Sequence, residues 1–447
     1  MRLRKTDISG IKLFAASVTY SLALVFAYVR FAYEDYSYLG FQLNDSASMF
    51  HAVILAIVSS LFCFLLPKAV NKPSHLLGIL TYLLVYIPTV NVGYFSISHP
   101  SYSHAELVLM YSACMLILLC VPRLGSQTAL RTFGLNAKLF WGGSLFITLI
   151  CTGVVMAYYR TDFSSLFSLQ DISALYDIRF EYRETGRQVP ALVQYMFAWL
   201  VKFFWPLVLV IGLDRNSKPL IFFSFFGFLS LLATSGHKSI ILEYFLVLGF
   251  WFIWRKGVGA STGAIIKFAL CISVSAILLE YVGISVLLEV IIRRSMLIPG
   301  LLSSFYQDFF TVNHKAALGY SVLSGLVDYP YATTPPFVIG EYYFGRSEMS
   351  ANANFIAAGF AEFGVIGSIG VALIAATVYR VLDLLARSKK SFRISTALAV
   401  APSWALVDTS LFTVLLTHGL LLLIVTLYIS PNERTSNPRQ VISGGAV

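Results

Sequence analysis

Arginine recurs every fourth residue in one polar stretch of the sequence, and this spacing could do chemistry. Arg179, Arg183 and Arg187 would form a cationic stripe along a continuous helix. Gly186 could instead end that helix before the third arginine. Because the planar guanidinium group suits a bidentate grip on phosphate, the stripe predicts a phosphate-binding helix. The alternative interpretation is a solvated surface helix, in which Glu184 pairs with Arg187.

Further cationic residues extend this prediction. Arg293 and Arg294 directly follow an apolar stretch, which places them at a membrane–water boundary, the depth of a lipid headgroup, although snorkelling at a helix end is the alternative. Lys238 lies in the short turn TSGHKS, where a lysine is usually just solvated. Together these residues would suit a ligand with an apolar tail and a charged diphosphate. The predicted diphosphate-binding residues are Arg179, Arg183, Arg187, Lys238, Arg293, Arg294 and Lys315.

The stretch from residue 288 to 355 also contains residue types that suit a sugar. Aromatic rings stack on the CH faces of sugars and amides bond their hydroxyls, although interfacial tyrosines are common in any membrane protein. The predicted glycan-binding residues are Tyr320, Tyr342, Asn352 and Asn354. Titratable side chains there could act as a general base. The predicted catalytic residues are His314, Glu341 and Asp328, with Asp308 and Glu348 as further candidates.

Motifs for other chemistries are absent. The sequence has no Walker loop, no GxSxG elbow and no His/Cys cluster with zinc spacing, so no metal and no other cofactor is expected. Glu34 and Asp35 are adjacent acids after the first apolar run, a pattern that is usually incidental in a surface loop. The five cysteines lie in apolar runs and are expected to be small buried hydrophobes.

The rest of the chain must hold these groups in a membrane. Of its 447 residues 57% are apolar and 12% charged, and the mean hydropathy is +0.76. This composition excludes a cytoplasmic enzyme, a disordered regulator and a secreted disulfide scaffold. Continuous apolar runs also exclude an outer-membrane barrel. The net charge of +10 must be divided between two membrane faces, so no nucleic-acid partner is expected.

The apolar runs predict an all-α polytopic membrane protein with about twelve transmembrane helices. Asp408-Thr409-Ser410 separates the last two as a tight hairpin, or as a polar kink in one long helix, which would give eleven. The predicted spans are 11–29, 49–66, 76–95, 105–121, 138–159, 194–213, 219–234, 239–254, 263–287, 356–378, 394–409 and 412–429.

Basic residues predict the sidedness of these spans. The sequence MRLRK precedes the first apolar run and no small-residue cleavage site follows it, so we expect an uncleaved anchor with a cytoplasmic amino terminus. Most of the 32 Lys and Arg residues then fall on the inner side. The predicted organisation is helices 1–5 in 1–159, an outer loop at 160–193, helices 6–9 in 194–287, an outer loop at 288–355, helices 10–12 in 356–430 and a cytoplasmic tail at 431–447.

The two long outer loops are exceptions to this charge bias. They contain Arg160, Arg179, Arg183, Arg187, Arg293, Arg294, Lys315 and Arg346. Long loops can escape the bias without any functional reason. The alternative, which we favour, is an external anion site.

Three features of the chain resemble the bacterial O-antigen, or oligosaccharide repeat-unit, polymerases of the Wzy type. The turn SGHK at 235–238 is similar to the Gly-x-Arg/Lys turn of that family, and the outer loops carry arginines as family members do. The sequence NANFI at 352–356, running into FGVIG at 363–367, is similar to the family's Asn-containing loop end and FG-x-x-G helix start. Where relatives often carry a Glu four residues after that Asn, this chain has Ala358, and Glu362, one turn later, is the only nearby substitute for a catalytic carboxylate.

The resemblance implies a GT-C-like architecture and a lipid-linked glycosyltransferase in the bacterial inner membrane. Both termini would be cytoplasmic and the active site would face the periplasm. The enzyme would join undecaprenyl-pyrophosphate-linked glycans into O-antigen or a related surface polysaccharide of lipopolysaccharide biosynthesis, without a metal. A chain-length regulator protein is a further implied partner.

Two other functions remain open from the sequence. An O-antigen ligase would use the same donor but pass the glycan to lipid A core. A non-enzymatic transporter or flippase of lipid-linked sugars would use the same arginines as a binding site, although the halves of the chain show no internal repeat.

Overall fold

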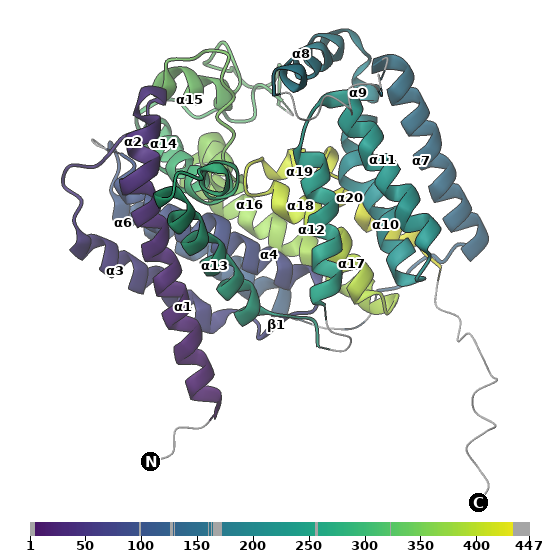
Figure 1. Ribbon diagram of the computed structural model, residues 1–447, viewed down its shortest axis with the longest axis horizontal. Coiled ribbons are helices and arrows are strands. Elements are labelled where there is room, and N and C mark those ends of the chain that lie inside the picture. Colours follow the sequence, from purple (N-terminus) through teal and green to yellow (C-terminus); the bar gives the residue numbers. More distant parts are fainter. Residues whose placement is uncertain are drawn as a thin grey trace, which may run out of the picture. The chain divides into compact units, whose positions relative to one another are not determined.

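Apart from two short strands, the regular elements of the described residues are all helices. The computed structural model describes residues 5–97, 100–125, 128, 130–159, 161, 163, 172–254, 258–321 and 323–431 (Figure 1). Eight helices in these ranges are long and apolar enough to cross a membrane. The chain is therefore an all-α polytopic membrane protein, as predicted. The eight are Gly10–Tyr36, Pro73–Phe95, His104–Arg123, Ala137–Tyr159, Ala191–Asp214, Lys218–Ser235, Thr262–Tyr281 and Phe355–Ser388.

The count of twelve spans stays a prediction, because several of the predicted segments form short helices in the described part of the chain. Three apolar helices, Met49–Leu65, Ser239–Ile253 and Leu420–Ile429, have 10–17 residues. The segment predicted as the last two spans is divided into four helices, and Asp408 lies in a turn between the second and third. The predicted tail at 431–447 lies outside the described residues from 432 onward.

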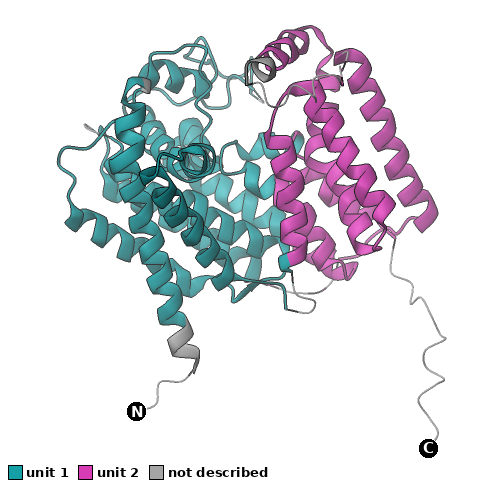
Figure 2. Cartoon of the chain, in the orientation of Figure 1, with its two compact units in different colours: residues 1–124, 253–380, 402–416 teal, residues 125–252, 381–401, 417–447 magenta. Residues whose placement is uncertain are grey.

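The helices form two compact units, which Figure 2 shows in different colours. Unit 1 comprises residues 1–124, 253–380 and 402–416. Its elements are α1 (Lys5–Ala27), η1 (Tyr28–Ala32), α2 (Tyr33–Tyr36), η2 (Ser37–Leu39), α3 (Met49–Ser60), η3 (Leu61–Leu65), β1 (Ala69–Val70), α4 (Pro73–Thr81), η4 (Tyr82–Tyr86), α5 (Ile87–Phe95), α6 (His104–Cys120), η5 (Val121–Arg123), β2 (Ala260–Ser261), α13 (Thr262–Tyr281), η8 (Leu288–Leu297), α14 (Ile298–Val312), α15 (Pro335–Phe344), most of α16 (Phe355–Ser388), most of α18 (Val400–Ala405) and α19 (Leu411–Leu416). Strands β1 and β2 pair antiparallel, with Ala69 opposite Ser261.

Unit 2 comprises residues 125–252, 381–401 and 417–447. Its elements are α7 (Ala137–Tyr159), α8 (Ile172–Gln188), α9 (Ala191–Trp199), η7 (Leu200–Phe204), α10 (Trp205–Asp214), α11 (Lys218–Ser235), α12 (Ser239–Ile253), α17 (Phe392–Leu398) and α20 (Leu420–Ile429). Helices α10 and α11 pack closely, because Gly227 leaves room for a tryptophan: a Cβ atom there would lie 2.2 Å from the ring of Trp205.

The second predicted outer loop begins as a core helix of unit 1. Residues 288–312 form a continuous helical run, η8 followed by α14, and Pro299 through Phe310 are buried. Helix α14 packs against α5, where a Cβ atom on Gly300 would lie 2.4 Å from the carbonyl oxygen of Pro88. The structure differs from the sequence interpretation because two arginines and a Pro-Gly pair interrupt the apolar pattern. The proline nevertheless lies in the first turn of α14, where it is tolerated.

Helix α16 folds back on itself near its beginning. Phe363 (φ −140°, ψ 24°) and Gly364 (φ 63°, ψ −145°) are not helical. The side chain of Ser368 donates to the carbonyl of Ile356 at 2.9 Å, although a straight helix would separate these two residues by about 18 Å. The first turns of α16, residues 355–362, therefore form a helical hairpin with the long helix that follows.

The cysteines are all free in the described chain. Cys63, Cys114 and Cys151 are buried as expected, but Cys120 and Cys271 are exposed. The prediction of burial was wrong for these two because an apolar run contains both lipid-facing and inward-facing positions, and cysteine is apolar enough for either.

We predict that Gly300→Ala destabilises unit 1. The added methyl group would meet the Pro88 carbonyl, so α5 and α14 would have to separate, at a cost of about 1–3 kcal/mol. Thermal unfolding in detergent should show a lower Tm. Gly370→Ala is the matched control, because a Cβ atom there meets nothing within 4 Å. Equal Tm values for the two variants would contradict the close crossing.

Candidate anion-binding site and intramembrane ion pair

Helix α8 carries the predicted arginine stripe. It runs from Ile172 to Gln188 and so continues through Gly186, which means that all three arginines lie on one helix. Arg179 is half-buried, whereas Arg183 and Arg187 are exposed. The interpretation in which Gly186 ends the helix early is therefore wrong.

Arg179, the first arginine of the stripe, contacts the turn TSGHKS that carries the predicted cation Lys238. Arg179 Nε donates to the carbonyl oxygen of Gly236 at 3.0 Å. Gly236 ends α11 with a left-handed φ of 65°, a conformation that favours glycine, and its amide bonds the carbonyl of Leu232 at 2.8 Å. This close turn presents His237 and the exposed Lys238 between α11 and α12. The structure thus brings α8 and the turn at 236–238 together.

The imidazole of His237 lies among these positive charges. Its ring contacts that of Tyr182 edge to face, with 5.8 Å between the ring centroids. Burial lowers the pKa of His237, and the positive charges of Arg179 and Arg183 lower it further. At neutral pH this side chain is therefore an uncharged hydrogen-bonding group beside permanent cations.

Arg187, the third arginine, has a different partner. It forms an exposed ion pair with Glu184 at 2.7 Å. The alternative interpretation, a solvated pair on a surface helix, is confirmed for this residue. Exposed pairs of this kind contribute little stability, and Arg187 stays only an assisting candidate.

The remaining predicted cations belong to unit 1. The guanidinium of Arg293 lies 4.1 Å from the ring centroid of Tyr36, and its Nε atom is buried without a hydrogen-bond partner in the described residues. Arg294 is exposed. Lys315 lies over the ring of Phe360 at 4.8 Å, and burial lowers its pKa. Each of the two ring contacts is a cation–π interaction.

The predicted general bases lie on the surface of unit 1. The side chains of His314, Asp328 and Glu341 are all exposed. The backbone carbonyl of His314 accepts a hydrogen bond from the hydroxyl of Tyr331. No described contact connects any of these three side chains to a predicted cation, so the structure adds no support for their role.

The predicted glycan-binding residues divide into accessible and inaccessible ones. Tyr342 and Asn352 are exposed, and Tyr320 is half-buried within a row of rings that continues to Tyr329 at 5.4 Å. Asn354, in contrast, is fully buried. The prediction of glycan contact was wrong for Asn354, because its side chain caps the first turn of α16.

The contacts of Asn354 show this structural role. Its amide nitrogen donates to Ser303 Oγ at 2.7 Å, and its oxygen accepts from the backbone amides of Ile356 and Ala357 at 3.1 Å. Asparagine is among the residues that most favour such a cap. From the sequence alone, an amide in a loop end cannot be distinguished from a ligand-binding one.

Glu362 is a buried acid that the sequence interpretation mentions only as a substitute. Its Oε2 accepts from the amide of Leu318 at 2.7 Å, and its Oε1 accepts from the hydroxyl of Tyr320 at 2.8 Å. Ala317 and Leu318 adopt left-handed φ values of 48° and 57° in this turn. The carboxylate therefore ties the loop after α14 to the apex of the α16 hairpin.

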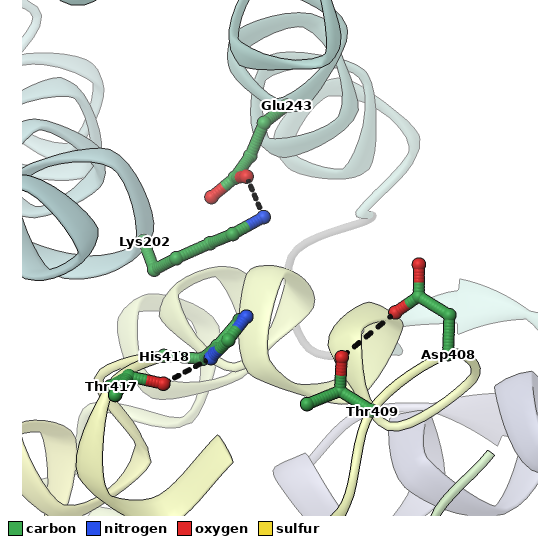
Figure 3. Close-up of polar contacts among 6 residues, drawn as sticks. All are labelled: Lys202, Glu243, Asp408, Thr409, Thr417 and His418. Atoms are coloured by element: carbon green, nitrogen blue, oxygen red, sulfur yellow. Dashed lines mark hydrogen bonds and ion pairs between the residues drawn. The ribbon is translucent and has the colours of Figure 1, made fainter. Parts of the chain in front are cut away.

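Unit 2 also contains an ion pair inside its apolar helices. Lys202 of η7 and Glu243 of α12 point toward one another, with 2.5 Å between Nζ and Oε2 (Figure 3). Gly419 precedes α20, where a Cβ atom would lie 2.7 Å from Cβ of Phe203, so the segment carrying Thr417 and His418 adjoins η7. The only sequence signal for this pair is the presence of two opposite charges in apolar runs.

Neither a metal-ligand cluster nor a related protein adds to the assignment of this site. Within the described ranges, no three His, Cys, Asp or Glu side chains gather as metal ligands. Comparisons with protein-family models, curated proteins and solved structures find no match to this chain.

We predict that an anion bound at α8 raises the pKa of His237. A negative charge would offset the effect of Arg179 and Arg183 and so favour the imidazolium form. NMR titration of the histidine ring in detergent, with and without inorganic pyrophosphate, measures this change. In the double variant Arg179→Gln/Arg183→Gln the pKa should already be higher without ligand, and pyrophosphate should no longer change it. An unchanged titration of the wild-type chain would contradict the anion site.

Proposed function

We propose that this chain is a glycosyltransferase that joins undecaprenyl-pyrophosphate-linked repeat units into O-antigen or a related surface polysaccharide. The observation that carries the proposal is the cationic cluster of unit 2, where Arg179 and Arg183 lie beside the turn with His237 and Lys238. This cluster stands at the ends of apolar helices, where a lipid headgroup would be. It therefore suits a diphosphate whose lipid tail remains in the bilayer.

The chemistry needs little more than charge and position. The acceptor hydroxyl attacks the anomeric carbon of the donor glycan, a new glycosidic bond forms, and the bond from that carbon to the diphosphate oxygen breaks. The diphosphate is already a good leaving group, so the protein mainly has to stabilise its developing charge and orient the acceptor. Arg179 and Arg183 supply guanidinium groups without any need for a metal.

The finer topology belongs to the same proposal. The chain would lie in the bacterial inner membrane with both termini cytoplasmic, in a GT-C-like arrangement of about twelve spans, and α8 would face the periplasm. The excess of Lys and Arg in the predicted inner segments supports this arrangement. A separate chain-length regulator would then set the size of the product.

The deciding experiment uses purified full-length protein in liposomes with one synthetic undecaprenyl-diphosphate-linked repeat unit. We expect a ladder of longer glycans on a gel. Transport of the substrate without any longer glycan would favour a transporter, and transfer only to added lipid A core would favour a ligase. Either of these results would refute polymerisation.

We predict that Arg183→Gln reduces the apparent affinity for the lipid-linked substrate about 10- to 100-fold, because it removes charge-assisted hydrogen bonds to phosphate. The measurement is the substrate dependence of the initial extension rate. Arg131→Gln is the matched control, since Arg131 is another exposed arginine of unit 2, in the segment ahead of α7 and not on α8 or in the turn at 236–238. Wild-type kinetics for Arg183→Gln would remove the assignment of α8.

A further inference from the structure

The ion pair of unit 2 lies where charges are rare. Lys202 belongs to the span Ala191–Asp214, and Glu243 to the apolar helix Ser239–Ile253. Their side chains are 25% and 6% exposed, respectively. Ionisable side chains inside apolar helices are expensive, so their presence points to a function more often than at a surface.

One of the two carboxylate oxygens of Glu243 accepts no hydrogen bond from the described residues. Its Oε2 binds Lys202, but its Oε1 is buried and has no hydrogen-bond partner among the described residues. A buried acceptor without a partner is costly, which means that an additional donor would be stabilised there. Because Lys202 is the more accessible member of the pair, such a donor would reach Glu243 alongside the ammonium group.

The backbone that carries Lys202 is the only π-helical segment in the described part of unit 2, although η1, η4 and η8 of unit 1 are π-helical as well. Residues Leu200–Phe204 form the π-helical turn η7 between two α-helical segments, with Lys202 at its centre. Single π-helical turns inside α-helices are rare and occur frequently at functional sites. This feature is independent of the unused acceptor.

The pair presents complementary hydrogen-bonding groups side by side. Lys202 Nζ has three N–H donors, one of which is used by Glu243, and Glu243 Oε1 can only accept while it is ionised. A group that matches both must accept one hydrogen bond and donate another. An alcohol hydroxyl does both, and a sugar is rich in such groups.

We propose that Lys202 and Glu243 hold the acceptor hydroxyl of the sugar, and that Glu243 is the general base of glycosyl transfer. This inference rests on the proposed function. The hydroxyl accepts from Lys202 Nζ and donates to Glu243 Oε1. As its oxygen bonds the anomeric carbon, its proton passes to Glu243, and the carbon–oxygen bond to the diphosphate breaks. The diphosphate leaves with that electron pair, and Glu243 then releases the proton to water.

The location of the pair is consistent with this step. Helix α12 begins at Ser239, immediately after Lys238 of the cationic turn, so Glu243 lies about 6 Å along the helix axis from its start. The attacking hydroxyl and the leaving diphosphate must both adjoin the same anomeric carbon. A base one helical turn away from the diphosphate cations meets that requirement within a single unit.

The test measures glycan extension by variants in liposomes supplied with the synthetic lipid-linked repeat unit. Glu243→Gln should lower the rate at least about 100-fold, because the amide cannot accept the proton. Its binding of undecaprenyl diphosphate should remain unchanged, since the cationic turn is intact. Glu280→Gln is the matched control: it alters another acid with a buried, unpartnered oxygen, in α13 of unit 1, and should retain the wild-type rate.

A double variant separates catalysis from a structural role. Lys202→Met/Glu243→Gln removes both charges, so a purely structural pair predicts that the rate recovers, whereas a general base predicts that it stays low. Recovery in the double variant, or a wild-type rate in Glu243→Gln, would overturn the assignment. If Glu243→Gln does not fold, the extension rate of Glu243→Asp tests the assignment instead. It keeps the charge but withdraws the carboxylate by one methylene, and should be at least about tenfold slower.

The same experiment distinguishes this inference from the proposed function. Wild-type protein that extends no glycan refutes the polymerase function, and the assignment of Glu243 fails with it. Wild-type protein that extends glycan while Glu243→Asp does so equally fast refutes the base alone.

Discussion

The loss of hydration that a charge suffers among apolar helices is the constraint on which the rest of this structure depends. Cationic side chains accordingly gather on α8 and in the turn before α12, beyond the ends of the apolar runs. Two cations in the helices of unit 2 have specific partners. Lys202 lies against Glu243, and Arg393 lies 3.7 Å from the ring centroid of Trp251. Charge in unit 2 therefore marks two places, the turn beyond the helix ends and the Lys202–Glu243 pair within them.

Neutral polar groups inside unit 1 obey the same constraint through hydrogen bonding. The hydroxyl of Ser303 accepts from Thr89 at 2.9 Å and from Asn354 at 2.7 Å, and the hydroxyl oxygen of Tyr111 lies 2.9 Å from the same atom. It donates in turn to the carbonyl of Pro299 at 2.6 Å. Four separate segments are thus connected at one buried oxygen, which fixes α14 relative to the beginning of α16. A polar network of this kind specifies one arrangement of helices, since partial pairing would leave dipoles unsatisfied.

The sequence predicts the helical class and the amphipathic helix α8, because hydrophobic runs and the four-residue spacing of arginines are local patterns. It does not predict the helix at 288–312, since Arg293-Arg294 and Pro299-Gly300 look like a loop until α5 is known to pack against them. It misplaces Asn354 for a similar reason: whether an amide faces solvent or caps a helix depends on distant Ser303. The site is predicted in part, in that Arg179 and the turn at 236–238 meet, whereas the Lys202–Glu243 contact requires tertiary structure.

The hairpin at the start of α16 has a consequence for the order of assembly. Its reversal at Phe363 and Gly364 leaves the carbonyls of Ala361 and Glu362 without helical partners, and the amides of Ala316 and Ala317 bind them instead. Those amides are synthesised well before the hairpin that they seal. During translation the loop after α14 must therefore wait, with its polar backbone still hydrated, until the hairpin emerges.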